Sequence, residues 1–268
     1  MIDLSTIDYS VLDRPEISNC LFHPRPDVAA FPSSGPDAVI RIPVEEGIRI
    51  GAKFHVFDKA SPVILFFHGN GEIVSDYDDM AMIYQRMKIN FFPVDYRGYG
   101  LSDGFPTVTS MLRDAHMIFC FVKEWLDQHG LSGPLVVMGR SLGSASALEI
   151  AASYPDRISG LVIESGFAFA VPLLRLVGVD VDHLGITEES SMGNLDKMRN
   201  NRKPARIIHA EFDHIIPYSD GVALYDACPV RDKKLVMIEG ADHNSIFYHG
   251  MELYMKTIRD FLYGENPL

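Results

Sequence analysis

The chain has 268 residues, of which 47% are hydrophobic and 22% charged, so it is long and apolar enough to build a large core. This balance excludes collagen-like, coiled-coil and disordered chains, whose compositions are far more biased. The formal net charge of −12 disfavours a nucleic-acid partner, because binding to phosphates needs a basic surface.

The three cysteines, Cys20, Cys120 and Cys228, are widely spaced and form no CxxC motif. They therefore indicate neither a disulfide framework nor a thiolate zinc site, and we expect a reducing, cytoplasmic setting. The first residues lack the basic and apolar stretches of a secretory signal, and no uninterrupted apolar run of about eighteen residues occurs. We expect no membrane-spanning segment.

Residues 1–37 are rich in proline and their hydrophobic residues show little periodicity, which predicts a segment that wraps over the surface. Two extended runs follow at residues 39–44 and 48–57. Glu45-Glu46-Gly47 lies between them and predicts an N-terminal antiparallel hairpin.

Short apolar runs then alternate with helical stretches to the end of the chain. Strands are predicted at residues 63–67, 90–94, 135–138, 160–163, 205–209 and 235–238, and helices at 76–88, 107–128, 141–153, 217–227 and 246–262. Several of the strands are apolar without alternation, as strands buried on both faces are. This order predicts an α/β fold in one domain over residues 1–268, with a mostly parallel sheet and helices on both faces.

The predicted strand 135–138 is followed directly by Gly139-Arg140-Ser141-Leu142-Gly143 and then by a helix. Glycines two residues before and after Ser141 remove Cβ atoms that would collide in a very tight turn, so this pattern predicts a serine hydroxyl lifted clear of the sheet. The unpaired N–H groups of the helix N-terminus would lie beside it. The alternative is an ordinary turn in which Ser141 caps the helix.

His68-Gly69-Asn70-Gly71-Glu72 follows the strand at 63–67, at the same predicted edge of the sheet. A serine that attacks a carbonyl creates an oxyanion, which needs two N–H donors. The amides of Leu142 and Asn70 are the expected pair. We expect His68 to brace the turn by hydrogen bonding.

A serine nucleophile also needs a base. Among ten histidines, His243 alone lies between a predicted strand end and the last helix, so we expect it to be the base. Asp213 follows the strand at 205–209 and can orient His243. Glu164 and Asp242 are the alternative acids.

These motifs give the chain a resemblance to the α/β-hydrolases over roughly residues 38–262. The shared blocks are His68-Gly69-Asn70-Gly71, Asp95-Tyr96-Arg97-Gly98-Tyr99-Gly100, Gly139-Arg140-Ser141-Leu142-Gly143 and the loops of Asp213 and His243. The combination is similar to a subgroup of small hydrolases with little or no cap domain, some of them esterases or depalmitoylating thioesterases. The resemblance implies an α/β-hydrolase fold and a Ser141/His243/Asp213 triad, with Asn70 and Leu142 as oxyanion donors.

The chain departs from that pattern at two acidic positions. Glu72 stands where many relatives carry a small or amide residue, so a carboxylate near the site could affect which acyl groups enter. Asp242 stands where glycine is frequent before the histidine. Residues 165–203 are too short for a full helical cap, and their apolar part, residues 166–179, predicts either a small lid that forms an acyl-chain wall or a helix packed on the core.

The expected function is hydrolysis of a carboxylic ester or thioester of a small-molecule or acyl substrate through an acyl-enzyme, without metal or organic cofactor. A small serine peptidase or amidase is the nearest alternative, because the same triad cleaves amides. A non-catalytic binding protein of the same fold is the second. A metal site formed by His209, Asp213 and His214 is the third.

Overall fold

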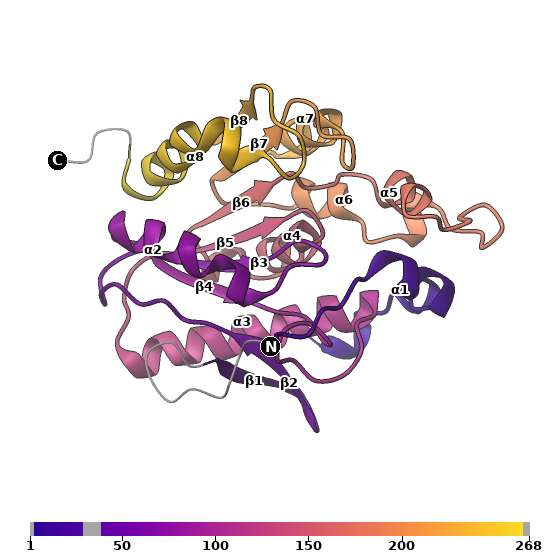
Figure 1. The fold of residues 1–268 in the computed structure, drawn as a ribbon, viewed down its shortest axis with the longest axis horizontal. Coiled ribbons are helices and arrows are strands. Elements are labelled where there is room, and N and C mark those ends of the chain that lie inside the picture. Colours follow the sequence, from indigo (N-terminus) through magenta and orange to yellow (C-terminus); the bar gives the residue numbers. More distant parts are fainter. Residues whose placement is uncertain (1–2, 29–38, 265–268) are drawn as a thin grey trace.

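The computed structural model describes residues 3–28 and 39–264, and an eight-stranded sheet runs through its centre (Figure 1). The strands are β1 (Ile40–Glu45), β2 (Ile48–Ala52), β3 (Val63–Phe67), β4 (Asn90–Val94), β5 (Leu135–Arg140), β6 (Gly160–Glu164), β7 (Ala205–Ala210) and β8 (Lys233–Ile238). Their order across the sheet is β1-β2-β4-β3-β5-β6-β7-β8. The pairs β1/β2 and β2/β4 are antiparallel, and every other pair is parallel. The predicted fold class is therefore confirmed.

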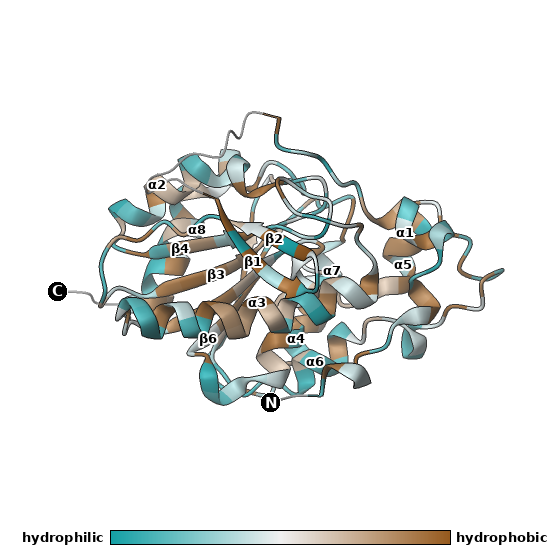
Figure 2. Ribbon diagram, turned by 90° about the horizontal axis from the view of Figure 1, so that it is seen from below, coloured by the Kyte–Doolittle hydropathy of each residue, from teal (hydrophilic) through white to brown (hydrophobic). Residues whose placement is uncertain are grey.

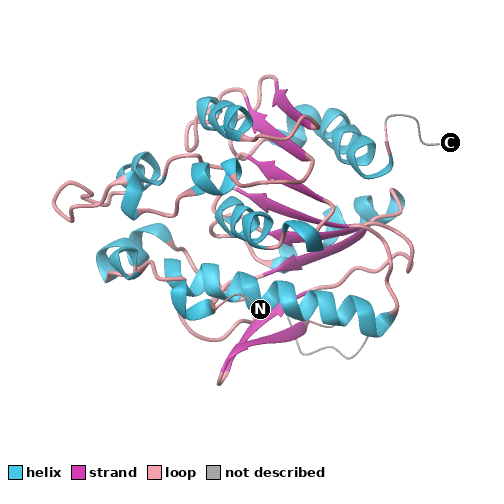
Figure 3. Cartoon of the chain, turned by 180° about the vertical axis from the view of Figure 1, so that it is seen from behind, coloured by secondary structure: helices cyan, strands magenta, loops and turns pink. Residues whose placement is uncertain are grey.

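Helices cover both faces of this sheet (Figure 3). The α-helices are α1 (Pro15–Leu21), α2 (Asp78–Arg86), α3 (Val108–His129), α4 (Gly143–Ser153), α5 (Ala170–Leu176), α6 (Asn194–Arg199), α7 (Tyr218–Ala227) and α8 (Ile246–Tyr263), and the 3₁₀ turns are η1 (Leu4–Thr6), η2 (Ser10–Leu12), η3 (Val74–Tyr77), η4 (Pro155–Arg157) and η5 (Glu188–Ser190). Helices α2 and α8 pack on one face, and α3, α4, α6 and α7 pack on the other. In β3, Val63, Leu65 and Phe67 meet the second group of helices while Ile64 and Phe66 meet the first. Two covered faces explain why these strands are apolar without alternation.

The chain reverses direction across the sheet at β3, because β4 lies on one side of it and β5 on the other. Open parallel sheets bind ligands beyond the strand ends at such a switch point. Figure 2 shows the hydrophobic strands in the middle of the molecule, with α1 and α5 together at one end of it. These two helices contact each other.

Most element boundaries agree with the predictions, and three differ for local reasons. Strand β2 ends at Ala52, after which the chain reaches β4 through an isolated bridge between His55 and Phe91. Helix α2 is preceded by the turn η3 and ends at Arg86, shortly before Lys88 takes a left-handed conformation (φ 61°). Helix α4 begins at Gly143 rather than at Ser141, because Ser141 is itself left-handed (φ 51°).

The expectation that residues 1–37 wrap over the surface stays a prediction, and where the structure describes them some of their side chains also enter the core. Leu12, Ile17, Leu21 and Phe22 are buried in the same hydrophobic cluster as the sheet. The helix that carries two of them, α1, has seven residues, which is too short to show a clear hydrophobic period. Residues 1–2 and 29–37 of that prediction lie outside the described residues.

Cys20, Cys120 and Cys228 are free cysteines. The expected cytoplasmic setting stays a prediction. Across residues 3–28 and 39–264, none of the helices has both the length and the apolar character needed to cross a bilayer.

Leu12→Ala should lower the free energy of unfolding by about 2–5 kcal/mol, because a fully buried leucine leaves a cavity when it is truncated. Urea denaturation followed by circular dichroism measures this change. Val28→Ala is the control, since Val28 is 91% exposed and its truncation should change stability by less than about 0.5 kcal/mol. Equal stability of the two variants would show that the N-terminal segment is not part of the core.

Candidate active site

Ser141 lies at the tight turn between β5 and α4, where the positions two residues before and after it have room only for glycine. Its φ of 51° is a left-handed conformation that a residue with a Cβ seldom adopts. A Cβ on Gly143 would lie 2.1 Å from the carbonyl oxygen of Phe67, and a Cβ on Gly139 would lie 2.3 Å from that of Gly143. The two glycines therefore let α4 begin directly against the ends of β3 and β5, with Ser141 at the apex.

The structure brings Ser141, His243 and Asp213 into one hydrogen-bonded chain. The distance from His243 Nε2 to Ser141 Oγ is 2.9 Å, and from His243 Nδ1 to Asp213 Oδ2 it is 2.7 Å. All three residues are buried, and they come from the loops that follow β5, β8 and β7. The carboxylate requires that His243 Nδ1 donates, so Nε2 is left to accept the Ser141 hydroxyl proton.

Asp213 is held in its charged form. Burial opposes ionisation, yet the hydrogen bond and charge of His243, together with the Ile216 amide, hold the pKa of Asp213 below its ordinary value. Its second oxygen accepts the N–H groups of Ile215 and Ile216 at 3.0 and 2.8 Å. These bonds fix the plane of the carboxylate that faces His243.

The two alternative acids are bonded elsewhere. Glu164 accepts hydrogen bonds from Arg140 Nε at 3.1 Å and from the Tyr254 hydroxyl at 2.7 Å. Asp242 accepts from the Ser245 hydroxyl at 2.8 Å and from the Asn244 amide at 3.0 Å. Within the described part of the chain, neither carboxylate bonds to the imidazole of His243.

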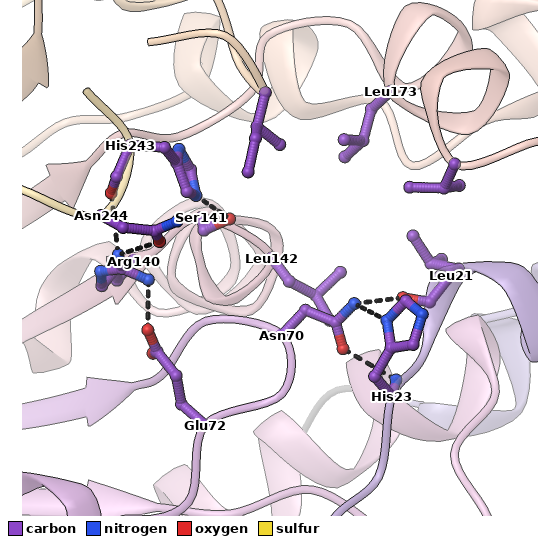
Figure 4. Close-up of a pocket in the computed structure, with 12 residues that line it drawn as sticks. Leu21, His23, Asn70, Glu72, Arg140, Ser141, Leu142, Leu173, His243 and Asn244 are labelled. Atoms are coloured by element: carbon purple, nitrogen blue, oxygen red, sulfur yellow. Dashed lines mark hydrogen bonds and ion pairs between the residues drawn. The ribbon is translucent and has the colours of Figure 1, made fainter.

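The turn after β3, residues 68–72, faces the serine turn across a cavity and is called the β3 turn below. Asn70 and Leu142 both line this cavity. In residues 3–28 and 39–264, neither of their backbone N–H groups has a protein acceptor. The side chain of Asn70 points away from Ser141, toward Leu21 and His23 (Figure 4). Only its backbone amide is therefore left to serve a ligand.

His68 braces the β3 turn from below, as expected. It is fully buried, with Nδ1 2.7 Å from the carbonyl oxygen of Gly69 and Nε2 3.1 Å from Asp95 Oδ1. The hydroxyl of Tyr96 donates to the carbonyl of His68 at 2.7 Å. These contacts make His68 part of the support of the turn rather than of the cavity wall.

Arg140 is a buried residue of the site that the sequence reasoning did not single out. Its guanidinium pairs with Glu72 and with Glu164, and Nη2 donates to the backbone carbonyl of His243 at 2.9 Å (Figure 4). Glu72 in turn accepts the N–H of Gly69 at 2.6 Å. One side chain thus connects the β3 turn, the end of β6 and the loop of His243. The available signal in the sequence was the position of Arg140, a charged residue between an apolar strand and Ser141.

The pairing explains the charge states of the carboxylates around Arg140. Burial disfavours the charged form of Glu72, but the charge of Arg140 and the Tyr77 hydroxyl hold the pKa of Glu72 below its ordinary value. Burial raises the pKa of Glu164 despite the same guanidinium. Both oxygens of Glu72 are bonded to the protein at the cavity wall, and its expected influence on which acyl groups enter stays a prediction.

The cavity beside Ser141 has a volume of about 310 Å³ and a mostly apolar far end. The apolar part of its wall is formed by Leu21, Leu142, Leu173, Val177 and Ile215. In helix α5, Leu173 lines the cavity while Leu174 is fully buried in the core, and a lid function of residues 166–179 stays a prediction. Helix α1 supplies the facing wall through Leu21.

Two of the three residues of the suggested metal site have other partners. His209 Nε2 lies 2.8 Å from the carbonyl oxygen of Ile216, and Asp213 faces His243. Over the described ranges, no three His, Cys, Asp or Glu side chains are grouped so that they could hold a metal ion.

Known proteins resemble the chain at the levels of sequence and fold. A family model described as serine aminopeptidase, S33, matches residues 58–178, which is less than half of the chain. Alpha/beta hydrolase domain-containing protein 17B of Homo sapiens is 28% identical over 228 residues, covering 82% of this chain and 73% of that protein. Protein bem46 of Schizosaccharomyces pombe is 29% identical over 217 residues, covering 78% and 70%.

Two solved structures share the architecture. Est1E from Butyrivibrio proteoclasticus, with bound ferulic acid, has a TM-score of 0.66 at 19% identity and covers 83% of this chain and 97% of that one. A soluble variant of monoglyceride lipase from Saccharomyces cerevisiae has a TM-score of 0.66 at 17% identity and covers 90% and 99%. At these identities the likeness concerns the fold.

Arg140→Met should lower the free energy of unfolding by about 3–5 kcal/mol at pH 7, because it leaves the buried Glu164 and the half-buried Glu72 without their cation. The pKa of Glu72 would then rise above that of the unfolded chain, and the pKa of Glu164, which burial already raises, would rise further. Stability of the variant is therefore lost as the pH rises through that interval, and its deficit should be larger at pH 8 than at pH 5. Urea denaturation at both pH values measures this.

Arg175→Met is the matched control, because the pair of Arg175 with Asp182 is exposed and should contribute less than about 1 kcal/mol. A deficit for Arg140→Met that is small, or equal at pH 5 and pH 8, would contradict the assigned charge cluster.

Proposed function

Because the chain is a member of the α/β-hydrolase superfamily, we propose that it is a serine hydrolase that cleaves a carboxylic ester or thioester through an acyl-enzyme. The observation that carries this proposal is the buried chain of hydrogen bonds from Ser141 through His243 to Asp213. A nucleophile, a base and an orienting carboxylate in this order are the arrangement that activates serine.

In the proposed reaction, Ser141 Oγ attacks the carbonyl carbon while His243 Nε2 takes its proton. The N–H groups of Leu142 and Asn70 stabilise the oxyanion, and Asp213, which stays ionised, stabilises the imidazolium. His243 then gives the proton to the leaving oxygen or sulfur as the bond to the carbonyl carbon breaks. Water, deprotonated by His243, attacks the acyl-enzyme. The acid leaves as its bond to Ser141 Oγ breaks, and His243 returns the proton to Oγ. These steps use only protein groups and water.

The cavity favours an apolar acyl group of limited length. The apolar residues of α1 and α5 that line this cavity of about 310 Å³ suit a single aliphatic chain rather than a two-chain lipid.

An ester or thioester fits this site better than the N-terminus of a peptide does. An aminopeptidase must bind the α-ammonium group of its substrate, which requires a carboxylate with a free oxygen near the serine. The oxygens of Glu72 and Glu164 already accept hydrogen bonds from Arg140, Gly69, Tyr77 and Tyr254. An amide substrate therefore stays the second candidate, and a purely binding protein the third.

Ser141→Ala should reduce turnover of a short-chain p-nitrophenyl ester by about 10⁴-fold or more without unfolding the chain. Intact mass after treatment with a fluorophosphonate should show one adduct on the wild type and none on this variant. Ser146→Ala is the matched control, because Ser146 is a buried serine in α4 whose hydroxyl has no partner among the described residues.

Retained turnover in a folded Ser141→Ala protein would overturn the serine mechanism. A folded wild type that forms no adduct and turns over no ester would favour the binding protein instead. Faster turnover of matched anilides than of esters would favour the amidase.

Leu173→Trp should shift the preferred acyl chain toward acetyl, because the larger side chain fills the apolar end of the cavity. The ratio of kcat/KM for octanoate to that for acetate should fall by at least about tenfold, as loss of burial for two or more methylenes costs about 1.6 kcal/mol. Leu176→Trp is the control, since Leu176 is exposed on the same helix and does not line the cavity. An unchanged ratio for Leu173→Trp would place the acyl chain elsewhere.

A further inference from the structure

The β3 turn contains Asn70 between two glycines, Gly69 and Gly71, and Gly71 has a φ of 76°. Glycine allows many backbone conformations, so a Gly-Asn-Gly turn does not by itself hold the Asn70 N–H in one direction. Glu72 restrains one side of the turn by accepting the Gly69 N–H. The direction of the Asn70 backbone N–H therefore depends on the hydrogen bonds that restrain the Asn70 side chain.

The side chain of Asn70 uses its full hydrogen-bonding capacity outside the cavity. Nδ2 donates to the carbonyl of Leu21 at 2.7 Å and lies 2.7 Å from His23 Nδ1, while Oδ1 accepts the His23 N–H at 2.9 Å and the Tyr99 hydroxyl at 2.6 Å. The Leu21 carbonyl can only accept and the His23 N–H can only donate. The amide orientation is therefore fixed by its neighbours, and His23 Nδ1 must be an acceptor.

Residues 21–27, the N-terminal strap, continue along the same turn. Arg25 Nε donates to the carbonyl of Gly71 at 3.1 Å, and its guanidinium pairs with Asp76. The Ser75 hydroxyl donates to Asp27 at 2.5 Å. Residues distant in sequence thus bond to both the side chain and the backbone of the β3 turn, and α1 anchors the strap in the core through buried Ile17 and Leu21.

We infer that Asn70 is a positioning residue, and that the N-terminal strap acts through its side chain to aim the Asn70 backbone N–H at the oxyanion that forms beside Ser141. This inference rests on the proposed function. The strap also lines the cavity with Leu21 and His23, so the N-terminal segment is a working part of the site. Figure 4 shows Asn70 between the cavity and the strap.

The chemistry predicts a specific kinetic signature. Displacing an oxyanion donor raises the free energy of the transition state, while the free energy of the bound ester stays nearly the same. Asn70→Asp keeps the shape of the side chain but loses both Nδ2 bonds and sets a carboxylate against the Leu21 carbonyl. Asn70→Ala removes every side-chain bond while the backbone N–H remains.

The experiment measures kcat and KM for a short-chain ester and the rate of fluorophosphonate labelling in wild type, Asn70→Asp and Asn70→Ala. We expect kcat and the labelling rate to fall about 10- to 100-fold, with KM changed less than about threefold. Asn201→Asp is the matched control, because the side chain of Asn201 is likewise held by backbone groups, those of Lys203, and lies away from the cavity. It should turn over ester as the wild type does.

Tyr99→Phe keeps the test available if the Asn70 variants do not fold, since it removes the hydroxyl that donates to Asn70 Oδ1 and accepts the His23 N–H. It should lower kcat in the same direction by about two- to fivefold. Folded Asn70 variants with wild-type kcat, or with a raised KM and unchanged kcat, would overturn the inference. A wild type that neither labels nor turns over ester would instead refute the proposed function on which it rests.

Discussion

The geometry of the whole strand-end region depends on one buried cation, the guanidinium of Arg140. It leaves β5 next to Ser141 and bonds to the β3 turn through Glu72, to the end of β6 through Glu164 and to the carbonyl of His243. A buried charge is costly unless every partner is in place, so this cluster tolerates one arrangement of the loops and few others. The interaction that restrains the loops is therefore electrostatic, while the sheet beneath them is held by apolar packing.

That division explains how a common architecture produces a defined site. The strands and helices bury their apolar residues on two faces and supply rigid ends, and the polar groups stand on the loops beyond those ends. The site is then closed by two short helices from opposite parts of the chain. Helix α1 and helix α5 contact each other and form the facing walls of the cavity. The selectivity of the cavity is accordingly a property of these additions rather than of the sheet.

The sequence was most informative where a residue pattern has a steric or packing cause that acts over a few positions. The unbroken apolar runs predicted β3 and β4 to the residue, and the glycines around Ser141 predicted a turn whose geometry leaves no space for a Cβ. The order of strands and helices was sufficient to predict the parallel sheet. Because parallel strands end at one edge, it also indicated that Ser141, Asp213 and His243 would lie close together.

The sequence was least informative where a contact joins distant residues. The burial of Leu12 and Ile17 in a proline-rich segment, the pairing of Arg140 with Glu72 and the bonds from Asn70 to Leu21 and His23 leave no local periodicity or spacing. The sequence alone therefore determined the fold class and the candidate nucleophile, base and acid, since steric and hydrophobic patterns along the chain encode them. Only the tertiary structure decided what surrounds them, because the partner of a buried charge or amide is chosen by proximity in space, which the order of residues does not record.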